Sequence, residues 1–495
     1  MYRIGFDNEK YLKMQSECIN ERINIFGNKL YLEFGGKLFD DFHASRVLPG
    51  FAPNSKVQML KQLADKAEIV LAINADDIEK NKIQGDHGIT YGEDILRLID
   101  EFRTEGLYVG SVVITKFSGQ EAASRFRRRL EQLELTVYLH YPIADYPTNI
   151  PLIVSDEGFG KNDYIHTSRP LIVVASPGAS SGKMATCLSQ LYHEFKCGVQ
   201  AGYAKFETFP VWNLPLRHPV NLAYEAATTN VGDINLIDPF HMENYHITSI
   251  SYNRDVEGFP VLDAIFRKIW GDSPYKSPTD MGVNMVGYCI NDDEVCQYAA
   301  SQEIIRRYYD ALCKYRTDGG LKSEIQKLEL LMNTAGISEQ NRTVVSRALA
   351  KSEVSESSSV AIELADGTII TGKTSALLGA AAAALLNALK FLAGIHDDVK
   401  LISPIMIEPI QKLKIDFLGN NNPRLHTDEV LIALSICTAT NPIAELVLDQ
   451  LPKLKNSEAH STVILSQVDI NTLKKLGINI TCEPVYNNKK LYHKK

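Results

Sequence analysis

This 495-residue sequence has few cysteines, eight in all, and none of them forms a C-x-x-C motif. The closest spacing, such as Cys289 to Cys296, matches no zinc-binding pattern. Isolated cysteines among apolar residues are typical of buried free thiols in a reducing compartment. The first residues, MYRIGFDNEKYLKM, lack the apolar core of a signal peptide. We therefore predict a cytoplasmic protein without disulfides and without a metal site.

An excess of positive charge and a long apolar run are also missing. The formal net charge is -8, whereas a dedicated nucleic-acid binder would be basic. The segment Ser375–Gly394 is rich in alanine and leucine, but its apolar run Ala376–Leu386 is too short to span a bilayer. Alanine is the best helix former. The segment therefore predicts a tightly packed buried helix, and we expect no nucleic-acid and no membrane partner.

The first half of the chain alternates between short apolar runs and longer runs with helical periodicity. The strand candidates are Leu30–Phe34, Ile69–Ile73, Val109–Thr115, Thr136–His140, Leu171–Ala175 and Ile234–Ile237. The helix candidates between them include Lys56–Lys66, Tyr91–Phe102, Gln120–Leu133 and Lys183–Phe195. Such alternation predicts an α/β fold with a mainly parallel sheet and helices on both faces.

The pattern changes after residue 260. Residues 261–351 are almost all helical in pattern, and the serine-rich stretch Ser352–Ser359 is the best linker candidate. A hairpin with an Asp366-Gly367 turn, the alanine-rich helix, a strand candidate at Val399–Ile402 and further helices follow. We therefore predict an α/β domain over residues 1–260, a helical region over 261–351 and a C-terminal α/β subdomain over 352–495.

The segment Arg169–Phe195 carries the main functional hypothesis. A buried strand, Leu171–Ala175, leads through small residues into an amphipathic helix. A phosphate favours this geometry, because small residues let backbone amides converge and the helix N-terminus adds roughly half a positive charge. Lys183 would add a full charge and take part in catalysis. The candidate ligand-binding residues are Gly178, Ser180, Ser181, Gly182, Lys183 and Thr186.

This P-loop-like segment departs from the Walker A pattern, G-x-x-x-x-G-K-[ST], at two positions. Pro177 replaces the first glycine, which a turn shifted to Gly178 could compensate. Met184 replaces the hydroxyl residue that binds magnesium, so that Thr186 or Ser181 would have to supply it. The cofactor would be a nucleotide with Mg²⁺, or the site works without a tightly held metal. A turn that merely joins strand to helix remains an alternative.

Two other motifs compete with this hypothesis. Gly178–Gly182 also matches G-x-S-x-G, the nucleophile elbow of hydrolases, with Ser180 as nucleophile. The Ser176-Pro177 break after the strand counts against an elbow. Gly367–Thr374, GTIITGKT, matches Walker A without a departure. Its β-branched residues resist a phosphate cradle and predict the return strand of the hairpin instead.

Acidic and basic side chains follow several predicted strands. Asp238 follows Ile234–Ile237, where a Walker B carboxylate would lie, and is our second candidate catalytic residue. Asp76, Asp77 and Lys116 also lie just beyond strand ends, where ligands bind in open α/β sheets.

Three polar clusters favour less specific interpretations. His241, Glu243 and His246 fit no H-E-x-x-H frame and predict a polar loop. Four arginines between residues 125 and 129 are surrounded by glutamates and predict a solvated helix face. Ser457–Ser461 predicts a polar turn before a strand.

Several long stretches resemble a known family. They are Tyr31–Phe51, Arg169–Lys183, Ala226–His241, Asp366–Gly394 and Arg424–Asp469. Together they resemble the bacterial family catalogued as domain of unknown function 1846, over essentially the whole chain. The resemblance implies an N-terminal α/β region, a helical middle and a C-terminal part similar in fold class to the cytidine deaminases. It implies no established activity, and residues 360–495 contain neither H-x-E nor P-C-x-x-C.

These observations leave three hypotheses and do not decide whether the protein is an enzyme. The leading one is a cytosolic protein that binds a phosphate-bearing ligand, most simply a nucleotide, for phosphoryl transfer or nucleotide hydrolysis. The second is a non-catalytic scaffold whose helical middle and alanine-rich helix mediate homo-oligomer contacts. The third is a serine hydrolase that uses Ser180.

Overall fold

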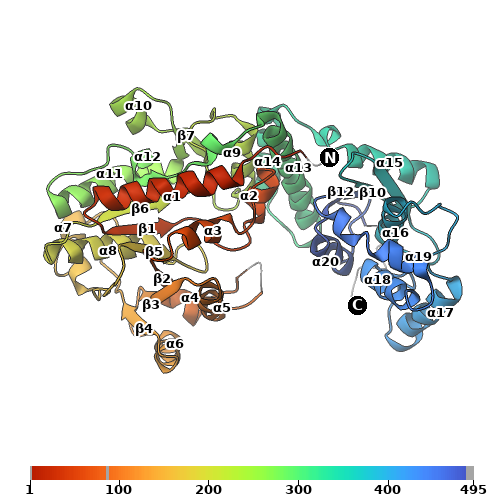
Figure 1. Cartoon of the computed structure of the whole chain (residues 1–495), viewed down its shortest axis with the longest axis horizontal. Helices are drawn as coiled ribbons and strands as arrows, with labels where there is room; N and C mark the ends of the chain where they lie inside the picture. The colour runs from red at the N-terminus through yellow and green to blue at the C-terminus, as the bar shows by residue number, and fades with distance from the viewer. Residues whose placement is uncertain (1–2, 85–87, 487–495) are drawn as a thin grey trace. The chain divides into compact units, whose positions relative to one another are not determined.

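The computed structural model describes residues 3–84 and 88–486. The chain divides into two compact units, which are described separately (Figure 1). The N-terminal unit comprises residues 4–225 and 232–299, and the C-terminal unit consists mainly of residues 300–486. The division falls inside the long helix α13 (Asp293–Thr317), whereas the sequence predicts boundaries near residues 260 and 351. Helical periodicity alone does not show on which neighbours each end of such a helix packs.

A seven-stranded sheet with only parallel pairings forms the centre of the N-terminal unit. Its strands are β1 (Leu30–Phe34), β2 (Ala67–Asn74), β3 (Tyr108–Thr115), β4 (Thr136–Leu139), β5 (Leu171–Ala175), β6 (Gly202–Phe206) and β9 (Gly282–Val283). They are arranged in the order β4-β3-β2-β5-β1-β6-β9. The predicted parallel α/β sheet is confirmed, with β5 at its centre between β2 and β1.

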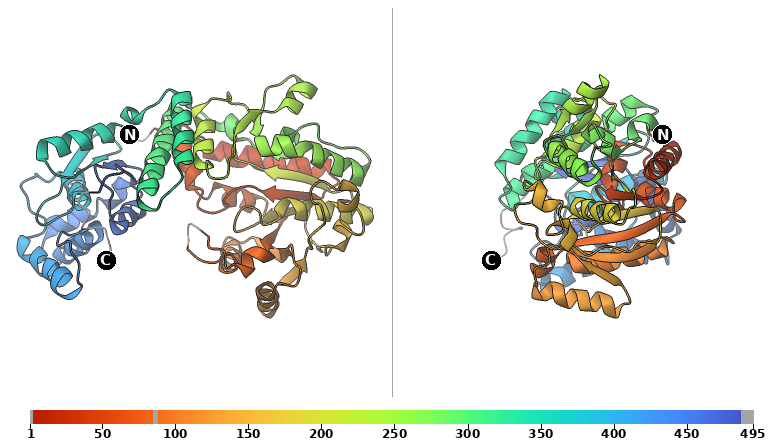
Figure 2. Two further views of the ribbon diagram at one scale, coloured as in Figure 1. Left: turned by 180° about the vertical axis from the view of Figure 1, so that it is seen from behind. Right: turned by 90° about the vertical axis from the view of Figure 1, so that its left-hand side faces the viewer.

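Helices cover both faces of this sheet (Figures 1 and 2). The helices of this part of the chain are α1 (Asn8–Ile25), α2 (Phe42–Val47), α3 (Ser55–Gln62), α4 (Ala75–Glu79), α5 (Tyr91–Thr104), α6 (Glu121–Gln132), α7 (Ile150–Ile153), α8 (Lys183–Lys196), α9 (Pro219–Ala227), α10 (Pro239–Tyr245), α11 (Asn253–Trp270) and α12 (Pro278–Met281). Helix α1 packs on α3 and β6, whereas α8 packs on β5, β1, β6 and α11. All five residues of β5 are buried, as expected for a strand covered on both faces.

One predicted strand of the large sheet belongs elsewhere. Residues Asn235–Ile237 form β7, which pairs antiparallel with β8 (Ile250–Tyr252) in a separate two-stranded sheet. Leu236 and Ile237 are exposed, so this run is not the buried core strand that its composition suggested. The expectation that it joins the parallel sheet is therefore wrong, because an apolar run of this length does not specify its pairing partner.

The C-terminal unit contains a four-stranded mixed sheet in the order β11-β10-β12-β13. Its strands are β10 (Ser359–Glu363), β11 (Ile369–Lys373), β12 (Glu458–Ser461) and β13 (Asn479–Cys482). The predicted hairpin is confirmed, since β10 and β11 pair antiparallel and Gly367 has a φ of 85° at the turn. Strand β10 is also antiparallel to β12, and β12 is parallel to β13.

The helices of this part of the chain lie mostly around the sheet. They are α13, α14 (Lys322–Ala335), α15 (Thr343–Ser355), α16 (Ala380–Leu392), α17 (Pro404–Lys412), the π-helical turn η4 (Leu413–Phe417), α18 (Thr427–Cys437), α19 (Pro442–Leu448) and α20 (Gln467–Lys475). Ala361 contacts buried residues of α15, whereas Val360 and Ile362 on the other face belong to the larger core around α16. The alternation along β10 therefore places the two helices on opposite faces.

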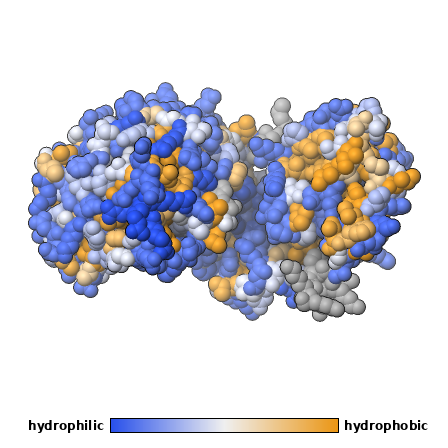
Figure 3. Space-filling view, turned by 90° about the horizontal axis from the view of Figure 1, so that it is seen from below, coloured by the Kyte–Doolittle hydropathy of each residue, from blue (hydrophilic) through white to orange (hydrophobic). Residues whose placement is uncertain are grey.

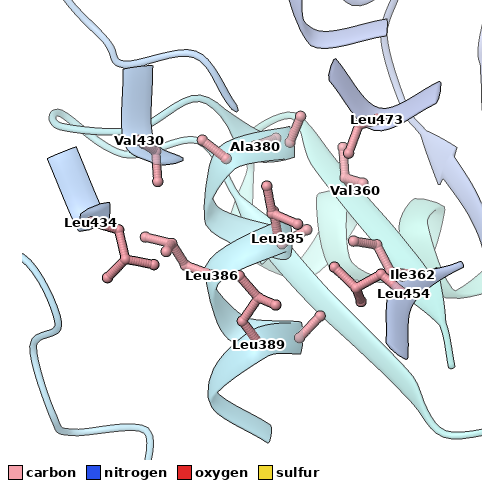
Figure 4. Close-up of a cluster of buried hydrophobic side chains, with 14 of the residues drawn as sticks. Val360, Ile362, Ala380, Leu385, Leu386, Leu389, Val430, Leu434, Leu454 and Leu473 are labelled. Carbon is pink, nitrogen blue, oxygen red and sulfur yellow. The ribbon is translucent and has the colours of Figure 1, made fainter. Parts of the chain in front are cut away.

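The alanine-rich helix α16 lies at the centre of this core (Figure 4). Its side chains Leu385, Leu386 and Leu389 face Val430 and Leu434 of α18 or the strands of the sheet. The predicted buried helix is confirmed. No helix within residues 3–84 and 88–486 is long and apolar enough to cross a bilayer.

Three local predictions in the C-terminal part are wrong. The serine-rich stretch is not a free linker, because Ser352 and Ser355 lie in α15 and Ser359 begins β10. Val399–Ile402 forms no strand, although Leu401 and Ile402 are buried. Residues Glu458–Ser461 form the core strand β12 rather than a polar turn, because their polar groups are satisfied by buried partners.

Candidate functional site

The predicted phosphate-binding loop lies at the carboxyl edge of the parallel sheet. Strand β5 ends at Ala175, the loop covers residues 176–182, and α8 begins at Lys183. Ala179 and Ser180 are exposed, so the loop is open to solvent. The predicted strand-loop-helix arrangement is confirmed, and the carboxyl edge of a parallel sheet is where open α/β folds bind ligands.

Two glycines let the loop pack closely against neighbouring elements. A Cβ on Gly178 would overlap the Tyr91 side chain, 2.8 Å from its Cζ atom. A Cβ on Gly182 would lie 2.9 Å from Thr115 Oγ1, and Gly182 has a φ of 89°. Ser180 also has a positive φ, 62°, which is unusual for a residue with a side chain. The glycines of the motif are therefore required by the local backbone path and by packing.

Hydrogen bonds inside the loop hold its shape. The Ser176 and Ser181 hydroxyls both donate to the Gly178 carbonyl, at 2.7 and 3.0 Å. Thr115 at the end of β3 donates to the Ser181 carbonyl at 2.8 Å. These bonds occupy the carbonyls of Gly178 and Ser181 and hold the loop in one conformation.

The start of α8 offers unused backbone donors. Its N-cap residue, Gly182, makes no side-chain capping bond, and the Thr186 amide donates to the Gly182 carbonyl at 2.9 Å. The amides of Lys183, Met184 and Ala185 therefore precede the helical hydrogen-bond ladder and have no partner within it. Together with the helix dipole they create a positive potential at the loop.

Lys183 adds a cation to these donors. Its Nζ donates to Ser176 Oγ at 3.0 Å, and within the described parts of the chain no carboxylate lies within ion-pair distance of it. Burial lowers the pKa of Lys183, while nearby Glu33 raises it. A cation held by one neutral hydroxyl in a partly desolvated position can accept an incoming anion without first breaking an ion pair.

Glu33 is a carboxylate beside the loop that the sequence analysis overlooked. It lies on β1, directly in register with Val174 of β5. Its Oε2 atom accepts a 2.6 Å hydrogen bond from the Tyr203 hydroxyl. It also contributes to raising the pKa of Cys187 in α8, second to burial. Glu33 therefore lies beside Lys183, where a carboxylate could hold a proton or orient a water molecule.

A second cluster of charges follows along β6. Lys205 Nζ lies 2.8 Å from Glu207 Oε1 and 2.5 Å from Asp255 Oδ2 of α11. All three side chains are largely buried, with 17%, 9% and 16% of their surface exposed. Burial alone would lower the pKa of Lys205, but Glu207, Asp255 and Glu33 raise it above its ordinary range. Two carboxylates thus share one lysine close to Glu33 and the loop.

Glu207 is the member of this cluster whose pKa is raised, and the effect of its titration on stability can be measured. Burial raises its pKa to about 7, because Lys205 compensates only partly and Asp255 repels it. A raised carboxyl pKa means that stability present below about pH 4.5 is lost as pH rises through about 7. We expect Glu207→Gln to add about 1–3 kcal/mol to the free energy of unfolding at pH 8.5 and little at pH 4.5.

Guanidinium unfolding at both pH values would measure this difference. Glu257→Gln, which changes an exposed glutamate of α11, is the matched control and should change neither value. An equal effect of Glu207→Gln at both pH values would show that the protonation of Glu207 does not change between them, which would contradict this prediction.

Not every predicted ligand-binding residue reaches solvent. Ser181 and Thr186 are fully buried, and the Ser181 hydroxyl is occupied by the Gly178 carbonyl. The buried Thr186 Oγ1 has no hydrogen-bond partner among the described residues. With Met184 at the Walker A hydroxyl position, Mg²⁺ would need the Ser181 or Thr186 hydroxyl, and both of these residues are buried. The donor set therefore does not fit the predicted magnesium, and Ser180, Lys183 and the amides are the accessible groups.

Asp238 does not lie at this site's sheet edge, because β7 is not part of the seven-stranded sheet. It caps α10, accepting from the His241 amide at 3.0 Å, and its other oxygen accepts from Thr279 Oγ1 at 2.7 Å. Asp238 is completely buried. Both carboxylate oxygens thus join structural elements, and the geometry gives no support to a catalytic role.

Two of the remaining candidates, Asp76 and Asp77, have structural partners. Asp76 accepts from Gln120 at 3.0 Å, and Asp77 pairs with Lys82 at 3.3 Å, beyond the end of β2. Lys116 directly follows β3 and has a φ of 54°. No group of three or more histidine, cysteine or acidic side chains in the described chain is arranged to hold a metal ion, including the cluster around His241.

Two further predictions about polar and glycine-rich segments are confirmed. The arginine-rich helix α6 has Arg125 paired with Glu121 and Arg127 paired with Glu131 at 2.7 Å, on a solvated face. The second Walker A match is the return strand of the hairpin, as expected, because Lys373 ends β11 opposite Ser359. All eight cysteines are free.

Comparisons with known proteins agree on one family. The family model described as domain of unknown function DUF1846, N-terminal, matches residues 4–336, and the model of its C-terminal counterpart matches residues 340–492. A protein of Streptococcus thermophilus strain LMD-9, named UPF0371 protein, is 56% identical over 494 residues and covers 100% of both chains. A protein of Streptococcus pyogenes serotype M3, UPF0371 protein SpyM3_1021, is 54% identical over the same length and coverage.

Proposed function

The chain belongs to the DUF1846 family, and we propose that it binds a phosphate-bearing ligand, most simply a nucleotide, at the loop between β5 and α8. The single observation that carries the proposal is the position and hydrogen bonding of the Lys183 side chain. Its ammonium group lies at the start of a helix without a side-chain cap, beside an open loop, and among residues 3–84 and 88–486 its one hydrogen-bond partner is the Ser176 hydroxyl. A phosphate would receive hydrogen bonds from the loop amides and charge neutralisation from Lys183.

The proposed site uses Glu33 in place of Asp238. In phosphoryl transfer, catalysis comes from positioning and electrostatic stabilisation, with a carboxylate orienting the nucleophile. Glu33 is the carboxylate on the strand next to β5, and Tyr203 holds one of its oxygens. The P-loop-like character of the segment, phosphoryl transfer and nucleotide hydrolysis belong to this proposal.

The other two hypotheses receive less support from the same region. A hydrolase would need a base at the Ser180 hydroxyl, and no histidine in the described part of the chain is hydrogen-bonded to it. The likeness of the C-terminal unit to the cytidine deaminase fold class stays a proposal that rests on the family resemblance. We propose no deaminase chemistry there, because the zinc-binding motifs of that reaction are missing from residues 360–495.

Thermal unfolding with and without ligand tests the proposal. We expect at least one of pyrophosphate, ATP, ADP, GTP or a nucleotide sugar at 5 mM, in EDTA, to raise the melting temperature by several degrees. A ligand at 100 times its dissociation constant adds about 2.7 kcal/mol. Lys183→Ala should weaken binding about 10- to 100-fold, since a charged hydrogen bond contributes about 1.5–3 kcal/mol.

The chain itself supplies a matched control. Lys373→Ala removes the lysine of the second Walker A match, which lies in a strand, and should leave the ligand-induced shift unchanged. Far-ultraviolet circular dichroism would show that both variants keep the wild-type fold. If no ligand stabilises the wild type, or if Lys373→Ala abolishes the shift instead, the proposal is wrong.

A further inference from the structure

The C-terminal unit carries an exposed apolar face on α17, η4, α18 and α19. Figure 3 views this unit from below and shows apolar side chains gathered over it. The ten large exposed side chains that we call the apolar face are Ile405, Met406, Leu413, Ile415, Phe417, Leu418, Ile432, Ile436, Ile443 and Leu446. Their exposed fractions range from 39% for Ile415 to 77% for Ile405.

The segment of α17 and η4 departs from the pattern expected for a monomer surface. A surface helix directs apolar side chains inward and charged ones outward. Here Lys414 is turned inward and is 2% exposed, donating to the Arg424 carbonyl and to Glu429 Oε2, both at 2.7 Å. Ile407, seven residues earlier, is also buried, so these two mark the inner stripe. Phe417, three residues after Lys414, is 76% exposed.

The size of the face distinguishes it from scattered surface residues. With these exposed fractions, the ten residues leave on the order of 1,000 Å² in solvent, whereas the largest apolar patch of a typical monomer is about 300–600 Å². A standard protein interface buries about 800 Å² on each partner. The face is therefore large enough for one complete side of a stable interface.

We propose that this apolar face is a dimerisation surface whose occupant is a second copy of the same chain. In a two-fold dimer the same surface meets itself, so it must be self-complementary. An apolar centre meets that condition, and the exposed charges among these residues have both signs: Glu408, Lys412, Asp416 and Glu445. An anionic membrane is disfavoured as the occupant, because three of these four charges are acidic and the chain carries a net charge of -8.

Analytical ultracentrifugation of the full chain from 0.5 to 50 µM tests this inference. We expect the wild type, with a chain mass of 55.2 kDa, to sediment at twice that mass. Phe417→Glu and Ile432→Glu should each raise the dimer dissociation constant at least about 30-fold, as expected for central residues of an interface. Val354→Glu changes an equally exposed apolar residue of α15 outside the face and should leave the dimer intact.

Hydrogen–deuterium exchange of the wild type supplies a measurement that needs no variant. Amides of residues 404–418 and 428–446 should exchange more slowly at 50 µM than at 0.5 µM. A wild type that is monomeric at 50 µM overturns the inference, as does a dimer that survives both substitutions. Binding to phosphatidylglycerol vesicles by a monomeric wild type would also overturn it and assign the face to lipid.

Discussion

Arg342→Ala is expected to destabilise the C-terminal unit by about 3–5 kcal/mol, the loss typical when one partner of a buried ion pair is removed. Arg342 is completely buried near the start of α15. Its guanidinium donates to Glu458 at 2.5 Å, Gln302 at 3.2 Å, Thr481 at 3.1 Å, and the carbonyls of Ala459 at 2.9 Å and Asn479 at 2.8 Å. One side chain therefore joins α13, α15, β12 and β13.

The loss is large because several buried acceptors would lose their donor together. Although burial alone would raise the pKa of Glu458, Arg306 and Arg342 hold it below its ordinary value. Without Arg342, Glu458 keeps Arg306 at 2.7 Å and the Asn479 amide at 3.0 Å, both on Oε1, and loses the donor to Oε2. The carbonyls beside it face a cavity that the methyl group of alanine does not fill.

Urea unfolding followed by circular dichroism would measure this effect. Arg347→Ala, on the exposed side of the same helix, is the matched control and should stay within about 0.5 kcal/mol of the wild type. If Arg342→Ala costs less than about 1 kcal/mol, the buried network does not stabilise this unit.

Gly372→Ala is also expected to destabilise the C-terminal unit, for a different reason. Helix α16 crosses β11 so closely at Gly372 that an added Cβ would lie 2.5 Å from the Ala384 Cα and closer still to its amide nitrogen. The clash is with backbone, which cannot rotate away, so the strand and the helix must separate. Overpacking of this kind typically costs about 1–3 kcal/mol or more.

The matched control is Gly379→Ala, because a Cβ there would meet the Leu425 carbonyl at an ordinary 3.6 Å. Its cost should stay below that of Gly372→Ala by at least about 1 kcal/mol in the same urea experiment. Equal costs would show that the α16–β11 contact can relax. Gly372 belongs to the second Walker A match, and this packing explains the glycine without a phosphate.

The sequence predicted five of the seven strands of the parallel sheet, because burial on both faces leaves a local signal, but it missed β6 and β9. The five consecutive apolar residues of β5, followed by Pro177 and Gly178, identify the strand and its end to the residue. The Asp366-Gly367 turn identified the hairpin equally well, since few residues adopt a positive φ. Both signals are local and need no knowledge of the fold.

Pairing partners and polar cores could not be predicted in this way. The run before Asp238 looked like a core strand of the large sheet but pairs in a separate two-stranded sheet. Strand β12 looked like a turn, because Glu458 and His460 are satisfied by partners distant in sequence, such as Arg342 and Thr481. Such partners become visible only when the fold brings them together.

The candidate site shows the same limit. The loop and Lys183 were evident from their spacing, whereas Glu33, Lys205 and Glu207 were not. The available signal was a charged residue inside an otherwise apolar strand, as Glu33 is in Leu30–Phe34, since burying a charge is costly without a purpose or a partner. The register of the strands then decides which strand ends lie side by side, and this register cannot be read from a single sequence.

A crystal of the full chain soaked with 10 mM pyrophosphate tests the central claim most directly, because it locates the anion. The account predicts phosphate oxygens roughly 2.7–3.2 Å from the amides of residues 180–184 and from Lys183 Nζ, with the Ser176 hydroxyl released by Lys183. An empty loop, or pyrophosphate bound only elsewhere on the chain, would contradict it.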